Sequence, residues 1–460
     1  MEQETQKSKK ILWVIIGVVL LILIILALFF FVGKNTKIGT TLGKVLPFGA
    51  VSDSVRNPDN TVTGDNNGIN PGDNTLAEEP IFRQLSDKAV AGEYAYEKNG
   101  EQFVRYVEKE TGYIFDVKIK DGTTTQITNT TIPRLYEAKW ALHGKAVILR
   151  YLDDGPSGGI QDTIKTPLAY LSLPDASSTD PMGKLRLEFL PDNITDVSIS
   201  PNGKSLFYLL KTNDGVSGSI VDISTKVTKE VFRNSFSEWI PELLDNGEII
   251  LTTKASSAVK GYAYRYTPKT GAFERLIREK TGLITHANNS GSKILFAGNV
   301  SQNIIFGAYD PKGFNNHGGD ITYEQIIPLS TLPEKCVWRG DDVHIFCAAM
   351  NSTLPQNTLP DEWYQGVVSF NDSFWSANID SGEITLLANP QTLINNAFDV
   401  ISPTLSSDQG YFIFINKKDG TLWSMKIPQE VQTADTPLPE LTPDEQKDAQ
   451  GSMSGSTTSN

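Results

Sequence analysis

One stretch of this sequence formally matches a catalytic motif. Residues 155–159 read GPSGG, which fits the G-x-S-x-G pattern of a nucleophilic serine. That pattern needs a sharp turn between a strand and a helix, so that the serine oxygen is presented for attack. Ser157 is followed instead by GGIQDTIKTPLAYL, a loop that leads into a strand. We therefore interpret this stretch as a polar loop.

The histidines and the paired acidic residues do not form a metal or acid–base motif. The four histidines are His143, His286, His317 and His344. They lie far apart, without an H-x-H or H-E-x-x-H spacing, so we expect no metal site and no cofactor. Asp153–Asp154 and Asp341–Asp342 fit solvated turns better than general acid–base pairs. A site assembled from several repeats at a central channel is an alternative that we keep.

The charge of the chain argues against a nucleic acid partner. The formal net charge is −13 over 460 residues. A surface that binds nucleic acid needs clustered lysine and arginine to displace counterions from the phosphates. The sequence contains no such cluster, and we expect no nucleic acid partner.

Residues 11–32, ILWVIIGVVLLILIILALFFFV, form an apolar run without a charged residue. As a helix this run would be about 33 Å long, enough to cross a bilayer core of about 30 Å. No small-x-small cleavage site follows Val32, so we predict an uncleaved signal-anchor whose partner is the membrane. The lysines on its two sides balance. We expect a cytoplasmic tail at 1–10 and an extracytoplasmic domain, because a short tail before a large domain is the usual signal-anchor layout.

Two segments beside the predicted domain are poor in large apolar residues. Residues 33–80 contain NPDNTVTGDNNGINPGDNTLAEEP, and residues 431–460 form an acidic tail. Such segments cannot bury enough surface to offset the entropy of ordering. We predict a disordered linker at 33–80 and a disordered tail at 431–460.

A repeated turn organises the sequence between these two segments. Each copy has a polar turn with glycine followed by an alternating apolar run, and the turn glycines are Gly100, Gly144, Gly203, Gly247, Gly291, Gly340 and Gly410. Their separations are 44, 59, 44, 44, 49 and 70 residues. A repeat of about 40–50 residues with four short strands is typical of a β-propeller.

We therefore predict an all-β fold over 81–430, a β-propeller of seven four-stranded blades, with six or eight blades as alternatives. A β-sandwich or a two-domain all-β protein would also give regular strands. The last unit contains three strands, and IFRQLS at 81–86 could supply its fourth. That pairing would close the ring and leave no free sheet edge.

One copy of the turn carries a resemblance to known proteins. Residues 198–210, SISPNGKSLFYLL, resemble the Ser-Pro-Asp-Gly-Lys motif of TolB-like, or WD-repeat-like, bacterial propellers. Asn202 stands where that family usually has Asp, and the Gly-His and Trp-Asp pairs of full WD repeats are absent. The resemblance implies a propeller fold and a bias toward protein interaction, and it implies no catalytic residues.

The two cysteines, Cys336 and Cys347, lie in one predicted hairpin. With Asp341 and Asp342 at the turn centre, each cysteine is five residues from the turn, and the two would face each other across the strands. A disulfide suits an exported domain, whereas two buried free thiols are the alternative.

The two longest repeat intervals contain insertions after the second strand of a unit. Loops at this position in different blades emerge on one face of a propeller, as a binding surface would. The candidate binding residues are Asp153, Asp154, Asp361, Glu362, Trp363 and Tyr364. Trp363 and Tyr364 are candidate exposed anchors, since aromatic side chains are enriched in interfaces. Alternatively, they fold back on their own blade or begin the next strand.

These features favour a membrane-anchored extracytoplasmic propeller that binds a protein or glycan of the cell envelope. An enzyme, a hydrolase or lyase with a site at the central channel, is a less favoured alternative. A component of an envelope assembly or secretion machinery is another. Carboxylates or histidine gathered at the channel mouth would favour the enzyme, and a shallow, aromatic face poor in carboxylates would favour binding.

Overall fold

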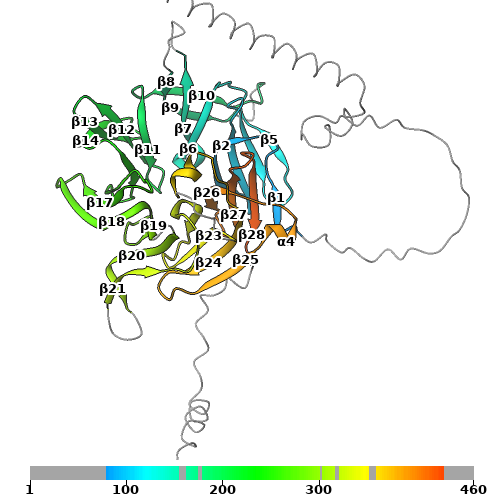
Figure 1. Ribbon diagram of the computed structural model, residues 1–460. Helices are drawn as coiled ribbons and strands as arrows, with labels where there is room; N and C mark the ends of the chain where they lie inside the picture. The colour runs from blue at the N-terminus through cyan, green and yellow to red at the C-terminus, as the bar shows by residue number, and fades with distance from the viewer. Residues whose placement is uncertain are drawn as a thin grey trace, which may run out of the picture. The chain divides into compact units, whose positions relative to one another are not determined.

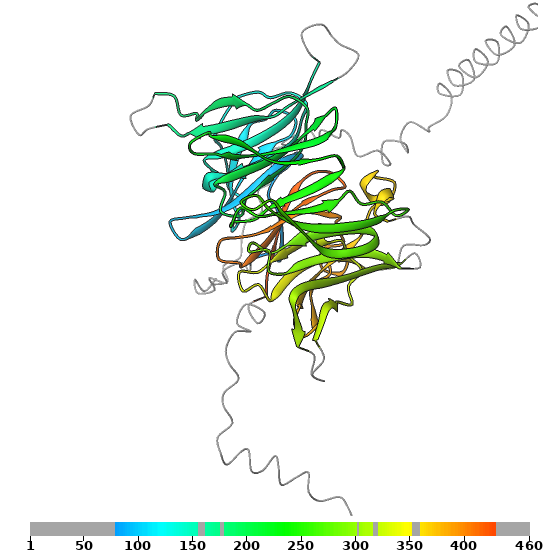
Figure 2. The same ribbon diagram turned by 90° about the vertical axis from the view of Figure 1, so that its left-hand side faces the viewer.

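The computed structural model describes residues 79–154, 162–174, 179–300, 303–315, 321–351 and 359–428. Within these ranges the strands are antiparallel and form six hydrogen-bonded sheets. Figure 1 shows the sheets side by side around a common centre, and Figure 2 shows the same arrangement from the side. The domain is therefore an all-β propeller.

The first three sheets follow each other along the chain. The first contains β2 (Val90–Lys98), β3 (Glu101–Glu108), β4 (Ile114–Lys118) and β5 (Thr124–Gln126). The second contains β6 (Leu135–Ala141), β7 (Ala146–Asp153), β9 (Pro167–Ser172) and β10 (Lys184–Phe189), with β8 (Thr163–Lys165) beside β7. The third contains β11 (Ile194–Ile199), β12 (Ser205–Thr212), β13 (Gly215–Asp222) and β14 (Thr228–Asn234).

The fourth sheet has seven strands. They are β15 (Trp239–Leu243), β16 (Ile249–Thr253), β17 (Lys260–Thr267), β18 (Ala272–Ala287), β19 (Ile294–Val300), β20 (Asn303–Asn315) and β21 (Ile321–Ile326). The long strand β18 pairs with β17 through its first part and with β19 through its second part. The register shifts between Thr281 and Ile284, and Gly282 within this shift has φ +66°, a conformation that glycine adopts without strain.

The last two sheets complete the ring. One contains β22 (Cys336–Trp338), β23 (His344–Met350), β24 (Asp372–Asn378) and β25 (Ile384–Ala388). The other contains β26 (Val400–Leu405), β27 (Tyr411–Asn416), β28 (Leu422–Lys426) and β1 (Phe82–Gln84). Phe82 pairs with Met425, so the start of the domain joins its end, as the sequence predicts for residues 81–86.

Helical structure in the described residues is limited to four short turns. They are the 3-10 turns η1 (Leu142–Gly144) and η2 (Pro333–Lys335) and the one-turn helices α3 (Asp361–Tyr364) and α4 (Pro390–Leu393). A search of the described part of the chain finds no helix with the length and apolarity that a membrane span requires. The predicted span at 11–32, the tail at 431–460 and nearly all of the predicted linker at 33–80 lie outside the described residues.

Strand β12 illustrates how the apolar runs build the core. Leu206 and Tyr208 pack in one buried cluster with Ile148 of the second sheet. Phe207, on the opposite face of β12, packs in another cluster with Trp239 of the fourth sheet. Because both faces of this strand are covered, its sequence is apolar at successive positions rather than at alternate ones.

The turn that precedes β12 shows how the residues of the SPNGK motif form a tight turn. The Asn202 Oδ1 atom accepts hydrogen bonds from the Ser200 hydroxyl and the Lys204 backbone N–H, both at 2.9 Å. Gly203 has φ +68°, and its carbonyl accepts a hydrogen bond from the Leu142 N–H at 2.9 Å. Asn202 thus makes the turn contacts expected of the aspartate of the family motif.

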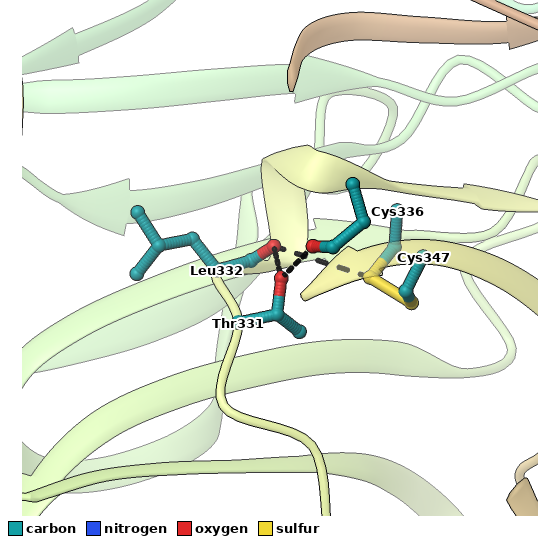
Figure 3. The surroundings of a disulfide bond; sticks show 5 residues. Thr331, Leu332, Cys336 and Cys347 are labelled. Carbon is teal, nitrogen blue, oxygen red and sulfur yellow. Dashed lines mark hydrogen bonds between the residues drawn. A yellow bond between two sulfur atoms is a disulfide. The ribbon is translucent and has the colours of Figure 1, made fainter. Parts of the chain in front are cut away.

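The two cysteines occupy directly opposed positions in the fifth sheet. Cys336 on β22 pairs in register with Cys347 on β23, and their sulfur atoms form a disulfide. Figure 3 shows the bridge beside Thr331 and Leu332, with the Cys336 sulfur 3.9 Å from the Leu332 carbonyl oxygen. Both cysteines are buried, so the bridge is part of the core of this blade.

Removing the disulfide is expected to lower the stability of the domain. On chain-entropy grounds, a bridge that closes a loop of this length contributes about 3 kcal/mol, because it restricts the unfolded chain. We expect the free energy of unfolding of the Cys336→Ala/Cys347→Ala variant, measured by urea unfolding, to be lower than that of the wild type by this amount. Reduction should destabilise the wild-type chain and leave the double variant unchanged. Equal stability of variant and oxidised wild type would contradict the prediction.

Candidate functional site: the central channel

A large hollow of the domain lies where the first strands of several sheets converge. This channel has a volume of about 1050 Å³ and is lined by residues of β2, β6, β11, β15 and β26, and of the second part of β18. Residues of η2 and α3 complete its wall. In Figure 1, α3 is the short yellow helix near the centre of the ring.

The channel wall is acidic. Among the described residues, six carboxylates line it: Glu93, Glu137, Asp196, Glu242, Glu334 and Asp361. Two lysines, Lys139 and Lys254, and one histidine, His286, also line it. These side chains come from different sheets, so the channel gathers charges that are far apart in the sequence.

Glu137 on β6 is the best-paired of the six carboxylates. It accepts a hydrogen bond from Arg150 at 2.6 Å and lies 3.3 Å from the Lys139 ammonium. Burial opposes ionisation, but these two cations outweigh it and lower the pKa of Glu137. Arg150 also donates to the carbonyl oxygens of Ile194 and Thr195, which ties the second sheet to the third.

Glu93 on β2 has the opposite electrostatic environment. Burial raises the pKa of Glu93 to about 8, although a hydrogen bond with Ser402 opposes the shift. Its Oε2 atom is buried without a hydrogen-bond partner in the structure. Burial also raises the pKa of Asp196, whose Oδ1 atom accepts the Val197 N–H at 2.7 Å. Of these three carboxylates, Glu137 is held ionised, whereas the ionisation of Glu93 and Asp196 is disfavoured.

A histidine–carboxylate pair lies on another side of the channel. The Nδ1 atom of His286 on β18 is 2.8 Å from an oxygen of Glu242 on β15. The other oxygen of Glu242 accepts the Ala287 N–H at 2.9 Å, which fixes the carboxylate. Burial opposes protonation of His286, but the contact with Glu242 and the charge of Glu334 raise its pKa.

Glu334 and Tyr364 form a second polar pair, between η2 and α3. Burial raises the pKa of Glu334, and a hydrogen bond with Tyr364 opposes the shift. Burial and the nearby Glu334 raise the pKa of Tyr364 well above its usual value. Tyr364 is 48% exposed, because it borders the water-accessible channel while protein surrounds its other sides.

A buried ion cluster holds α3 in place. The Lys335 ammonium lies 2.8 Å from Asp372 and 2.7 Å from Asp399, and all three side chains have no exposed surface. Asp399 also accepts the indole N–H of Trp363 at 3.0 Å. Lys335 lies next to Glu334 on η2, and Trp363 lies on α3. The cluster therefore holds both η2 and α3 in the channel wall.

The prediction that Trp363 is an exposed anchor is wrong. Trp363 is only 3% exposed, stacks on Phe370 and carries the Lys417 ammonium 3.6 Å from its ring centre. Its indole N–H finds a buried carboxylate, which an exposed position would not require. Trp363 folds back on its own blade, the alternative given above, and leaves Tyr364 at the channel.

The structure separates the other predicted binding residues. Asp361 lines the channel and accepts the Ser257 N–H at 2.5 Å. Glu362 is on α3 but is not part of the channel wall. Asp153 and Asp154 also lie outside the wall, and Asp154 pairs with Arg134 on the surface. The structure thus brings only Asp361 and Tyr364 of the six to the channel.

The other channel residues were not predicted individually, although the sequence holds a signal for them. Glu93, Glu137 and Asp196 each lie seven residues before the turn glycine of their own repeat. Glu242 and His286 each lie five residues before theirs. Positions at a fixed distance from the turn occupy equivalent places on the first strand of each blade, which faces the axis. An acidic residue recurring at these positions indicates an acidic channel.

No family model matches the chain, and no curated protein is similar to it. Similar solved structures include TolB from Acinetobacter baumannii, with 14% identity, a TM-score of 0.37 and coverage of 60% of this chain and 59% of TolB. An oligogalacturonate lyase in complex with manganese has 9% identity, a TM-score of 0.45 and coverage of 75% and 98%. The Cps50 (Swd1) β-propeller domain from Myceliophteria thermophila has 10% identity, a TM-score of 0.45 and the same coverage. The resemblance to TolB-like propellers is one of fold alone.

Proposed function

We propose that this protein is a membrane-anchored binding module of the cell envelope, whose ligand site is the central channel. Residues 11–32 are its anchor, with residues 1–10 in the cytoplasm, and 33–80 are its tether. The domain at 81–430 has seven blades, because the two parts of β18 belong to two adjacent blades. The Cys336–Cys347 disulfide supports an extracytoplasmic location, where such bonds persist.

The observation that carries the proposal is the channel itself. Its volume of about 1050 Å³ is at the upper end of the range for ligand pockets, roughly 300–1,000 Å³. Carboxylates from several blades converge on it, and burial disfavours the ionisation of three of them, Glu93, Asp196 and Glu334. Desolvating these groups costs folding free energy that a bound partner would offset.

Photo-crosslinking in intact cells tests this proposal. A photoreactive amino acid in place of Tyr364 should give a specific crosslinked product, because Tyr364 borders the channel and is exposed. The same amino acid in place of Tyr323 is the control, since Tyr323 is similarly exposed on the outer strand β21. Absence of a product from position 364, or equal products from both positions, would count against the channel as the binding site.

A second candidate function is an enzyme, which the carboxylates gathered at the channel and the His286–Glu242 pair favour by the criterion given above. A histidine held by a carboxylate can move a proton, and Glu93 and Glu137 have their pKa values driven apart as a catalytic acid and base would. The candidate reaction class is hydrolysis or elimination. Turnover of an envelope glycan or peptide that the His286→Asn variant abolishes would favour the enzyme over the binding module.

A further inference from the structure

We propose that the channel binds a lysine or arginine side chain of a partner polypeptide, whose flanking apolar residues rest on the rim of the channel. This inference rests on the proposed binding function and gives the chemical class of its ligand. The charge of the wall, the unpartnered carboxylate oxygens and the apolar rim are three separate observations behind it.

The charge of the wall favours a cation. Six carboxylates face two lysines among the described residues that line the channel. Lys139 is already paired with Glu137, and Lys254 is mostly exposed and lies 3.9 Å from Glu238. Neither lysine is within ion-pair distance of Glu93 or Glu334 in the structure. The chain itself therefore leaves these two channel carboxylates without a full countercharge.

The two carboxylates without a direct ion pair also lack a hydrogen-bond partner at one oxygen. The Oε2 atom of Glu93 and the Oε1 atom of Glu334 are buried with no partner in the structure. Buried oxygens of this kind usually accept a hydrogen bond, so each one indicates a missing donor. Both residues line the channel.

Glu93 and Glu334 both line the channel, and each has a hydrogen-bond partner that borders one smaller hollow. The partner of Glu93 is Ser402, and the partner of Glu334 is Tyr364. Ser402, Glu334 and Tyr364 line a single smaller hollow of about 260 Å³. One ammonium or guanidinium group has enough donors to bind both carboxylates at once.

The cationic side chains around this hollow are each held by another group of the protein. Lys417 lines it, but its ammonium donates to the Trp363 carbonyl oxygen and lies over the indole ring. Lys335 is held by Asp372 and Asp399. His286 is held by Glu242 and acts on Glu334 through its charge.

A metal ion fits this wall less well than an organic cation. Within the described part of the chain, no three histidine, cysteine or acidic side chains lie close enough together to hold a metal ion. An ammonium or guanidinium group instead needs only two suitably placed carboxylates and forms directional hydrogen bonds with them. The geometry of the wall therefore favours a side-chain cation.

The rim of the channel indicates that the cation belongs to a polypeptide. Four exposed apolar or aromatic residues lie in the channel wall or close to α3: Ile240, Val259, Tyr364 and Val367. Ile240 and Tyr364 line the channel, and Ser257, beside Val259, donates to Asp361 on α3. The Val367 N–H donates to the Glu362 carbonyl oxygen at 2.9 Å, which keeps Val367 next to α3. An acidic hollow with an apolar border suits a basic residue flanked by apolar ones.

Pools of capped nonapeptides can test the ligand class on the immobilised full-length chain. The central residue is lysine, arginine, norleucine or glutamate, and the flanks are mixtures of leucine, valine, alanine and serine. We expect the lysine and arginine pools to be retained at least about tenfold more than the other two. Equal retention of the norleucine pool would overturn the proposal.

Variants locate the binding groups. Glu93→Gln/Glu334→Gln should reduce retention of the lysine pool by about tenfold or more, whereas Glu110→Gln, an exposed glutamate outside the channel, should not change it. Retention by the wild type should rise from about pH 6 to about pH 9, as Glu93 loses its proton near pH 8. Unchanged retention by the double variant, with its fold verified by circular dichroism, would overturn the proposal.

A competition experiment separates a polypeptide ligand from a small cation. Spermine should displace the lysine pool only at much higher concentration, because it cannot contact the apolar rim. Displacement by spermine at the same concentration as the peptides would refute the polypeptide part. If crosslinks form at position 364 while the basic pools are not retained, the binding function stands and the cationic ligand class is wrong.

Discussion

Replacing Lys335 by methionine is expected to lower the free energy of unfolding by about 3–5 kcal/mol. Lys335 has no exposed surface, and its ammonium contacts Asp372, Asp399 and the Val400 carbonyl oxygen at 2.7–2.8 Å. Methionine fills a similar volume but leaves both aspartates buried without a cation. The loss is large because a buried charge without its partner keeps the full cost of desolvation.

The loss of stability caused by Lys335→Met should become smaller as the pH falls. Burial already raises the pKa of Asp372 in the wild type, whereas Lys335 lowers the pKa of Asp399 against the effect of burial. Without the lysine, both carboxyls are expected to bind protons more tightly in the folded state than in the unfolded state. The stability of the variant should therefore increase as the pH falls toward about 5, which narrows its deficit.

Urea unfolding followed by tryptophan fluorescence measures the Lys335→Met effect. The matched control is Lys260→Met, because Lys260 forms an exposed ion pair with Glu279. Such pairs contribute about 0–1 kcal/mol, so this control should stay close to the wild type. A Lys335→Met variant that also lies within about 1 kcal/mol of the wild type would show that the cluster is not a main support of this blade.

The fold could be predicted from the sequence because it depends on local, repeated features. A turn glycine such as Gly203 needs a positive φ, and a run such as that of β12 is apolar on both faces. Three of the six separations between the turn glycines equal 44 residues, so one copy helps to predict the next. Even the pairing of Phe82 with Met425 followed from counting strands in the last unit.

The candidate site could be predicted less well because it depends on contacts between distant segments. Nothing near Trp363 in the sequence indicates that Asp399 would accept its indole N–H and bury the ring. Glu93 and Glu334 come from opposite parts of the chain, and only ring closure brings both to one channel. The recurring distance between Glu137 or Asp196 and the turn glycine could have placed acidic residues on the axis. It could not have given their pKa values, which depend on burial.

The Glu93→Gln variant is expected to be more stable than the wild type in alkaline solution. The pKa of Glu93 is about 8 in the folded state against an ordinary value of 4.5, because burial disfavours the charged form. Between these two values the unfolded chain releases the proton while the folded chain retains it. The wild type therefore loses stability as the pH rises through this interval, and the loss is complete above pH 8. Glutamine does not ionise and avoids the loss.

The expected gain is roughly 2 kcal/mol at about pH 9, with little difference at about pH 4. The full pKa shift of Glu93 would correspond to a larger gain in the free energy of unfolding. Glu93 borders the channel, however, where water partly screens its charge. The control Glu110→Gln retains Glu93 and should match the wild type at both pH values, because Glu110 is exposed on a turn outside the channel. Urea unfolding at both pH values measures the effect, and a variant less stable than the wild type at alkaline pH would contradict it.

A stabilising substitution at Glu93 would also bear on the function of the channel. A carboxylate that destabilises the fold above neutral pH contributes nothing to the structure that glutamine could not supply. If the same substitution weakens binding of the lysine peptides, then the Glu93 carboxylate lowers the stability of the fold and raises the affinity for the peptide. The same concentration of peptide should then raise the melting temperature of the wild type at about pH 9 by more than that of Glu93→Gln. Equal shifts in both proteins would place the peptide elsewhere on the domain.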